Sequence, residues 1–131
     1  MHTVFDKTFS LFIIMGGIYT SGAGLLTVSP ELITPLFLLG FEKEYTLLIQ
    51  HWGFTTFLIG LAMIISVYKP MWREPVFLIA AVEKLYMLYL VIYHHSMGFV
   101  SVAVIDTLIS IYLLSYLYSL QKQTQGDKRI I

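Results

Sequence analysis

Three charged residues interrupt two long apolar stretches of this chain, and their types and spacing are those best suited to chemistry. Glu83 and Lys84 are adjacent within the apolar stretch 76–93, and Asp106 lies inside the next one, 99–120. An ionised side chain is costly inside a membrane, so such residues are usually paired with one another and mark functional sites. The sequence therefore predicts a polar centre formed by Glu83, Lys84 and Asp106.

Lys84 and Asp106 are expected to form an ion pair between neighbouring helices. The short turn 94–98 makes the two stretches antiparallel neighbours. A rise of about 1.5 Å per residue places Lys84 near the middle of the membrane and Asp106 about 4 Å further out. The pair costs less than either charge alone, because each partner replaces part of the other's lost hydration. Two interpretations stay open: a purely structural clasp, or a site that handles substrate or protons.

Glu83 is the acid that this pairing leaves over. It projects about 100° around the helix from Lys84, so the two side chains point in different directions. Glu83 is then protonated, shares Lys84 with Asp106, or contacts a hydroxyl such as that of Tyr86 or Thr56. Two acids beside one base is the arrangement that proton-coupled transport or acid–base catalysis requires. Glu83 is therefore the sharper candidate for function.

Histidines are the other candidate site residues. His51, with Gln50 beside it, lies about 8 Å outward of the midplane in the stretch 45–68. A histidine at this depth can relay protons or bind metal, but we favour a contact with a backbone carbonyl at the interface. His94 and His95 are adjacent and diverge, which makes a poor chelate. Haem ligation by His51 and His94 is disfavoured because their depths differ by about two helical turns, so we expect neither metal nor cofactor.

The composition is typical of an integral membrane protein. Of 131 residues, 57% are hydrophobic and 12% are charged, whereas about a quarter are charged in soluble domains. The length suits a single domain, 1–131. The formal net charge is zero, which argues against a nucleic-acid partner, and the chain has no cysteine, which excludes disulfides and iron–sulfur ligation.

Four stretches are long enough to cross a bilayer, which requires about 20 mainly apolar residues. We expect an all-α, polytopic membrane protein, a bundle of four transmembrane helices. The remaining segments are a short interfacial segment with two prolines, a connector in which Pro70 and Pro75 stop the helices, and a polar, frayed tail. The four spans are 8–28, 45–68, 76–93 and 99–120, and the other segments are 30–40, 69–75 and 121–131.

Lysine and arginine are distributed unequally over the two sides of this arrangement. Only Lys43 falls on the side opposite the termini. Cytoplasmic loops carry the excess of positive charge, so the sequence predicts a multi-pass protein of the cell inner membrane with both termini cytoplasmic. The residues on the cytoplasmic side are Lys7, Lys69, Arg73, Lys122, Lys128 and Arg129.

Small residues predict where the helices meet, since close backbone approach drives helix association in lipid. Each set recurs at helical spacing and defines one face of a span. We interpret the glycines and hydroxyls as packing residues. The sets are Gly16, Thr20 and Gly24 in the first span, with Gly17 and Ser21 beside them, Gly53, Thr56 and Gly60 in the second, and Ala103, Asp106 and Ser110 in the fourth.

Tyrosines form two further stripes at helical spacing, Tyr86, Tyr89 and Tyr93 in the third span and Tyr112 and Tyr116 in the fourth. The favoured interpretation is packing near the interface. The alternative is a tyrosine-lined cavity, flanked by Met63 and Met87, that accepts a flat apolar ligand such as a quinone or isoprenoid.

The glycines and the insert after the first span resemble those of the DoxX-like group of small four-helix bacterial membrane proteins. The likeness covers most of the chain and implies a four-helix membrane fold; some relatives look like subunits of oxidoreductase systems. Members often carry an acidic residue in the second span, where this chain has Gln50 and His51. The resemblance is carried by Gly16, Gly17 and Gly24, the segment 30–40, and Gly53 with Gly60.

These observations predict a small inner-membrane protein with a buried polar centre, acting as a binding or accessory subunit of a membrane system. One alternative is a proton-coupled small transporter working through Glu83, which predicts a homo-oligomer or larger complex. Another is a membrane enzyme acting on a lipid-soluble substrate, with Glu83 or Asp106 as the acid–base group and a lateral opening toward lipid. Whether the chain is an enzyme stays open. The expected partners are the bilayer and a lipid-soluble ligand, and missing nucleotide and metal motifs argue against ATP-driven or metal-dependent roles.

Overall fold

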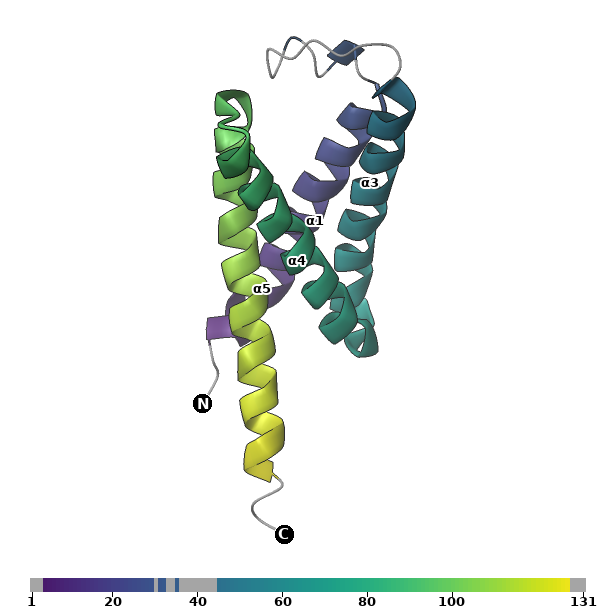
Figure 1. The fold of residues 1–131 in the computed structure, drawn as a ribbon. Helices are drawn as coiled ribbons and strands as arrows, with labels where there is room; N and C mark the ends of the chain where they lie inside the picture. The colour runs from purple at the N-terminus through teal and green to yellow at the C-terminus, as the bar shows by residue number, and fades with distance from the viewer. Residues whose placement is uncertain (1–3, 30, 33–34, 36–44, 128–131) are drawn as a thin grey trace.

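The described part of the chain folds into four long helices, with short turns between the second and third and between the third and fourth (Figure 1). The computed structural model describes residues 4–29, 31–32, 35 and 45–127. All four helices are long and apolar enough to cross a membrane, so the predicted all-α fold is confirmed. The long helices are α1 (Val4–Val28), α3 (Thr46–Tyr68), α4 (Arg73–Tyr93) and α5 (Val100–Asp127), and two turns contain the 3-10 helices η2 (Pro70–Trp72) and η3 (Met97–Phe99).

The helix ends differ from the predicted spans at two places. α4 begins at Arg73, so Pro75 lies in its first turn instead of in the connector. Proline is tolerated there because the first N–H groups of a helix have no intrahelical partner. α5 is helical up to Asp127, so residues 121–127 are not frayed. Most of the predicted interfacial segment 30–40 lies outside the described residues, as does Lys43.

The four helices pair into two hairpins. α1 packs most extensively against α3, and α4 packs against α5, while α3 and α4 meet at the turn that contains η2. The two hairpins approach each other at the end where α1 begins, and they diverge toward the turn between α4 and α5 (Figure 1). The molecule is therefore a splayed pair of hairpins, not an evenly packed bundle.

Glycines allow the backbones of α1 and α3 to touch. A Cβ atom on Gly24 would meet the backbone of Phe57, and one on Gly17 would lie 2.8 Å from the Gly60 carbonyl oxygen. Neither contact can be relieved by moving a side chain. Gly16 has more room, since its Cβ would come no closer than 3.4 Å to another side chain. The predicted seam is confirmed for Gly17, Gly24 and Gly60, whereas Gly16 lies beside it.

An aromatic core closes the end where the hairpins approach each other. The rings of Phe9, Phe77 and Tyr116, from three different helices, have centroids 4.7–5.9 Å apart. The Arg73 guanidinium lies 4.5 Å above the Phe9 ring and donates from Nη1 to the Tyr116 hydroxyl at 3.2 Å. Its Nε and Nη2 donate to two carbonyl oxygens near the C-terminus of α3, both at 3.1 Å. Arg73 thus joins all four helices at this closed end.

Candidate functional site

A cavity of about 1060 Å³ lies between the hairpins on the side where they diverge. This volume is at the upper end of the about 300–1,000 Å³ typical of small-molecule sites. Residues of all four helices line it, and most of the lining is apolar. Glu83, Lys84 and Asp106 form its floor near the middle of the helices, and Trp52 and His94 lie near its mouth. The cavity therefore leads from one end of the molecule to the predicted polar centre.

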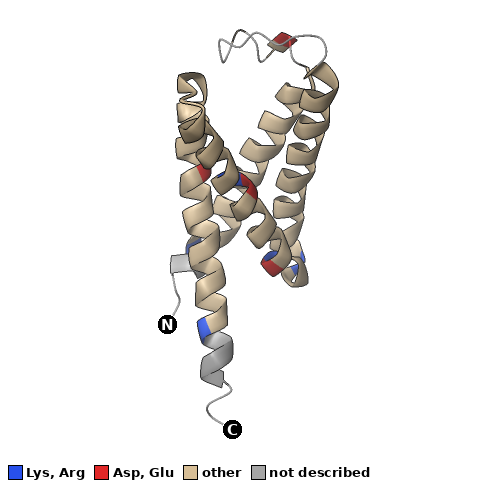
Figure 2. Cartoon of the chain, viewed as in Figure 1, with Lys and Arg blue, Asp and Glu red and all other residues tan. Residues whose placement is uncertain are grey.

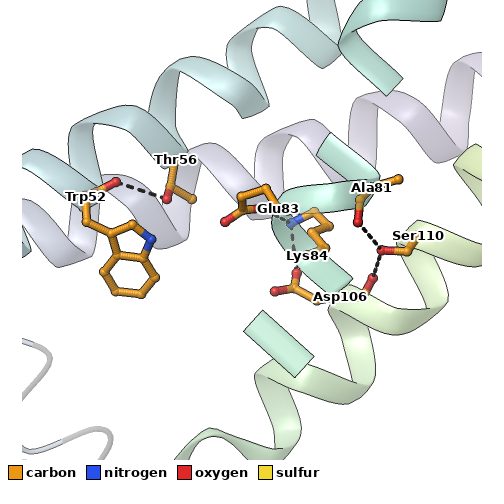
Figure 3. Close-up of polar contacts among 7 residues, drawn as sticks. All are labelled: Trp52, Thr56, Ala81, Glu83, Lys84, Asp106 and Ser110. Atoms are coloured by element: carbon orange, nitrogen blue, oxygen red, sulfur yellow. Dashed lines mark hydrogen bonds and ion pairs between the residues drawn. The ribbon is translucent and has the colours of Figure 1, made fainter. Parts of the chain in front are cut away.

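The predicted ion pair is confirmed at the floor of this cavity. Lys84 is only 2% exposed, and its Nζ donates to Asp106 Oδ1 at 2.8 Å (Figure 3). The Ser110 hydroxyl donates to the Asp106 carbonyl oxygen at 2.9 Å and contacts the Ala81 carbonyl oxygen of α4 at 3.4 Å. Ala103, Asp106 and Ser110 are all buried, as their shared face predicted. The pair and Ser110 together hold α4 against α5.

Glu83 shares Lys84 with Asp106, which is one of the three arrangements that the sequence left open. Its Oε2 lies 3.8 Å from Lys84 Nζ (Figure 3), close enough for an ion pair but too far for a hydrogen bond. Within the described part of the chain, Glu83 Oε2 is buried and has no hydrogen-bond partner. The Thr56 hydroxyl, one of the predicted contacts, donates to the Trp52 carbonyl oxygen at 3.0 Å (Figure 3). Glu83 is therefore the surplus acid that the sequence indicated.

The local sequence of α4 explains why these two neighbours have different surroundings. Its buried residues include Phe77, Ala80, Ala81 and Lys84, which recur at three and four along the helix and so share one face. The two alanines allow α5 to come close, and Lys84 follows them into the α4–α5 interface. Glu83, about 100° away around the helix, points out of that interface toward α3 and the cavity (Figure 3).

The candidates at the start of α3 are separate from the polar centre. His51 and Gln50 are exposed, and neither lines the cavity. Gln50 Nε2 donates to the Val28 carbonyl oxygen at 3.1 Å, which joins α3 to the end of α1. His94 lines the cavity mouth, and His95 adopts a positive φ of 51° in the turn that follows α4. Among the described residues, no three histidine or carboxylate side chains are grouped to hold a metal ion.

The two tyrosine stripes have different surroundings. On α5, Tyr116 is buried and Tyr112 stacks on a phenylalanine of α1 with centroids 3.9 Å apart, which confirms packing there. On α4, Tyr86, Tyr89 and Tyr93 are 56–65% exposed and stack on one another at 5.8–6.1 Å. The packing interpretation is therefore wrong for α4, whose stripe lies outside the core; Tyr86 also lines the cavity.

The positions of several residues relative to the cavity differ from those that the sequence predicted. Met87 lines the cavity as the flat-ligand hypothesis required, but Met63 is fully buried in the core instead. Thr20 was interpreted as a packing residue, yet it lines the cavity and its buried Oγ1 has no partner within the described residues. Trp52 was not considered a site residue. No signal distinguishes Thr20 beforehand, because it has the same spacing as the glycines of the seam.

An apolar cavity with a polar floor can bind a molecule that has an apolar body and one polar end. The apolar walls contact the body, and the few polar groups fix its orientation. No protein-family model, curated protein or solved structure matches this chain. The resemblance to the DoxX-like group therefore stays a prediction.

Proposed function

We propose that this chain is a multi-pass protein of the cell inner membrane that binds a lipid-soluble ligand between its two hairpins. It would serve as the binding or accessory subunit of a membrane system. The observation that carries this proposal is the cavity of about 1060 Å³ with apolar walls and a floor of Glu83, Lys84 and Asp106. A structural clasp alone would need the buried pair but no such cavity.

The charge distribution supports an orientation with both termini in the cytoplasm. The described lysines and arginines, apart from Lys84, lie at the end where α1 begins (Figure 2). Positive residues gather on the cytoplasmic side, so the closed end would face the cytoplasm. The cavity mouth near His94 would then face the outer leaflet, where a ligand can enter from lipid.

Quenching of a single tryptophan tests this proposal. Of the two tryptophans, Trp52 lines the cavity, and Trp72 lies in the turn at the opposite end. The W72F protein, in phosphatidylcholine nanodiscs, is titrated with dodecyl probes that carry a nitroxide near the end of the chain and an amine, hydroxyl or carboxylate head. We expect at least one probe to quench Trp52 saturably. The W52F protein reports, through Trp72, the quenching that comes from simple partition into the bilayer.

A cavity-filling variant supplies the control. A Cβ on Gly22 would meet nothing within 4 Å, and Gly22 lines the cavity, so Gly22→Phe fills the site without disturbing the helix seam. Leu25→Phe adds the same ring on an exposed position of α1 outside the cavity. Saturable quenching should disappear in Gly22→Phe and persist in Leu25→Phe. Non-saturable quenching by all three probes, equal for Trp52 and Trp72, would overturn the proposal.

Proton-coupled transport is the second candidate, and the closed end favours it. The aromatic core and Arg73 block the cavity on one side, as in one state of a carrier that opens alternately to each side. The chain has no native cysteine, so Ile13→Cys, placed in that core, is a clean reporter. Labelling by an impermeant maleimide from the cytoplasmic side would support transport; complete protection, with and without probe, would support static binding.

A further inference from the structure

Two buried polar atoms on opposite hairpins lack hydrogen-bond partners, and both belong to residues that line the cavity. They are Oγ1 of Thr20 on α1 and Oε2 of Glu83 on α4, and within the described part of the chain no other buried side-chain oxygen or nitrogen is left in this way. A buried polar atom that nothing satisfies is destabilising. Two residues that line the cavity thus each hold an oxygen atom that lacks a hydrogen-bond partner.

The other two threonines of the cavity wall, Thr27 and Thr56, differ from Thr20 because their hydroxyls are paired. Thr27 donates to the carbonyl oxygen four residues earlier at 2.7 Å, and Thr56 does the same at 3.0 Å. Threonine in a membrane helix is ordinarily satisfied by this contact. Thr20 is only 1% exposed, and its Oγ1 has no hydrogen-bond partner within the described residues.

The charges on the floor favour a head that donates a hydrogen bond. Lys84 is already engaged by Asp106 at 2.8 Å, whereas Glu83 lies 3.8 Å from it. Two carboxyl groups share one ammonium, which leaves the floor with surplus negative charge. An anionic head would face both carboxyl groups, and Lys84, the one lysine or arginine among the described lining residues, is already engaged by Asp106. An ammonium or hydroxyl head would donate to Glu83 Oε2, and the Thr20 hydroxyl can accept from either or donate to the latter.

The walls define the rest of the ligand. Beyond the floor, most of the lining is apolar, as at Leu26, Ile49, Leu90 and Val91, and further polar side chains such as His94, Ser96 and Ser101 lie toward the turn between α4 and α5. We propose that the ligand is an apolar molecule with a single hydrogen-bond-donating head, an amine or an alcohol, which binds between Thr20 and Glu83. This inference rests on the proposed function and narrows it to a class of ligand.

The same quenching assay tests this inference when the affinities of probes with different head groups are compared. In the W72F protein we expect the dodecyl amine and alcohol probes to bind at least about tenfold more tightly than the carboxylate, after correction for partition with the W52F protein. Glu83→Gln should weaken the amine about tenfold, because a charge-assisted bond is lost. The alcohol should lose less, since the amide oxygen still accepts from a hydroxyl. The head that binds more tightly to the W72F protein, amine or alcohol, identifies the class of ligand.

Thr20→Val gives a second variant of matched shape. It should weaken amine and alcohol about fivefold, as expected for one neutral hydrogen bond. Thr27→Val removes a hydroxyl that also lines the cavity but is already paired, and it should leave the ranking unchanged.

Three outcomes would overturn the inference while the proposed function stands. The carboxylate probe could bind as tightly as the amine. Glu83→Gln could leave the ranking of heads unchanged. Saturable binding could also occur with no preference among heads in any variant, which would mean that a water molecule, not the ligand, satisfies Thr20 and Glu83. Saturable binding of none of the probes would instead defeat the proposed function itself.

Discussion

The two ends of the molecule use the same four helices but are packed in opposite ways. At the closed end, the rings of Phe9, Phe77 and Tyr116 fill the space between the hairpins, and Arg73 bonds to α3 and α5. At the open end, a partly open cavity of about 1060 Å³ lies between the hairpins. The polar centre lies where the packed half gives way to the cavity.

Side-chain size on the facing helices accounts for this difference. Toward the closed end, α1 presents the large rings of Phe9 and Phe12 to α4 and α5. At the open end, α1 presents Thr20, Gly22 and Ala23 to the cavity. Because lipid supplies no hydrophobic drive between helices, they stay together only where side chains fit. The aromatic core can therefore hold the hairpins while the small residues leave room for a ligand.

Replacing Asp106 with asparagine should have the largest effect on stability, because it acts at the boundary between the two halves. Lys84 would keep its charge in a buried position, with Glu83 3.8 Å away as the nearest carboxylate. Breaking one side of a buried pair costs about 3–5 kcal/mol. Equilibrium unfolding in mixed detergent micelles measures the change in the free energy of unfolding.

Two control variants distinguish the contribution of the Lys84–Asp106 pair to stability from that of Glu83. Glu83→Gln should change the free energy of unfolding by less than about 1 kcal/mol, since Glu83 Oε2 has no hydrogen-bond partner in the described chain. The double variant Lys84→Met/Asp106→Leu should recover most of the loss, because it removes both charges. Equal destabilisation by Asp106→Asn and Glu83→Gln would show that all three charges form one structural unit.

Removing a ring from each end tests whether only the closed end is packed. Phe77 is fully buried, and Phe77→Ala leaves a void of about 100 Å³, which at about 24 cal/mol per Å³ costs about 2–3 kcal/mol. Trp52→Ala removes a larger ring from the cavity mouth, where it is 42% exposed, and should cost less than about 1 kcal/mol. Comparable losses in the same unfolding assay would mean that the open end is held together by its side chains as well.

Sequence alone could predict the helices and the central ion pair. A long apolar stretch leaves few alternatives to a membrane-spanning helix, and the short turn after α4 brings Lys84 and Asp106 to similar depths on neighbouring helices. Their opposite charges then favour contact, which the 2.8 Å distance confirms. The different direction of the Glu83 side chain could also be predicted, because adjacent residues of a helix cannot face the same neighbouring helix.

The cavity could not be predicted in the same way. It depends on the angle between the two hairpins, which is determined by contacts among residues far apart in sequence, such as Phe9 with Tyr116. The same limit explains the errors over individual residues. Gly16 and Gly17 are equally good seam residues by type, and the rotation of α1 that selects Gly17 is not encoded in their spacing. Likewise, the exposed stripe at Tyr86 and the packed one at Tyr116 have the same periodicity.

The smallest expected effect distinguishes two faces of α1 at the open end. A Cβ on Gly24 would meet the backbone of Phe57, whereas one on Gly22 would meet nothing within 4 Å. Gly24→Ala should therefore force α1 and α3 apart and cost about 1–2 kcal/mol. Gly22→Ala should be neutral or stabilise the protein by up to about 1 kcal/mol, because alanine favours the helix. Both changes are measured by the same unfolding titration.

Comparing these two substitutions tests whether the space beside Gly22 is open in the folded protein. Both substitutions add a single methyl group to the same helix, two residues apart, so helix propensity affects them in nearly the same way. A difference between them must come from what each Cβ meets. If Gly22→Ala destabilised as much as Gly24→Ala, the hairpins would have to close over Gly22, and the cavity beside Thr20 and Glu83 would be too transient to bind a ligand.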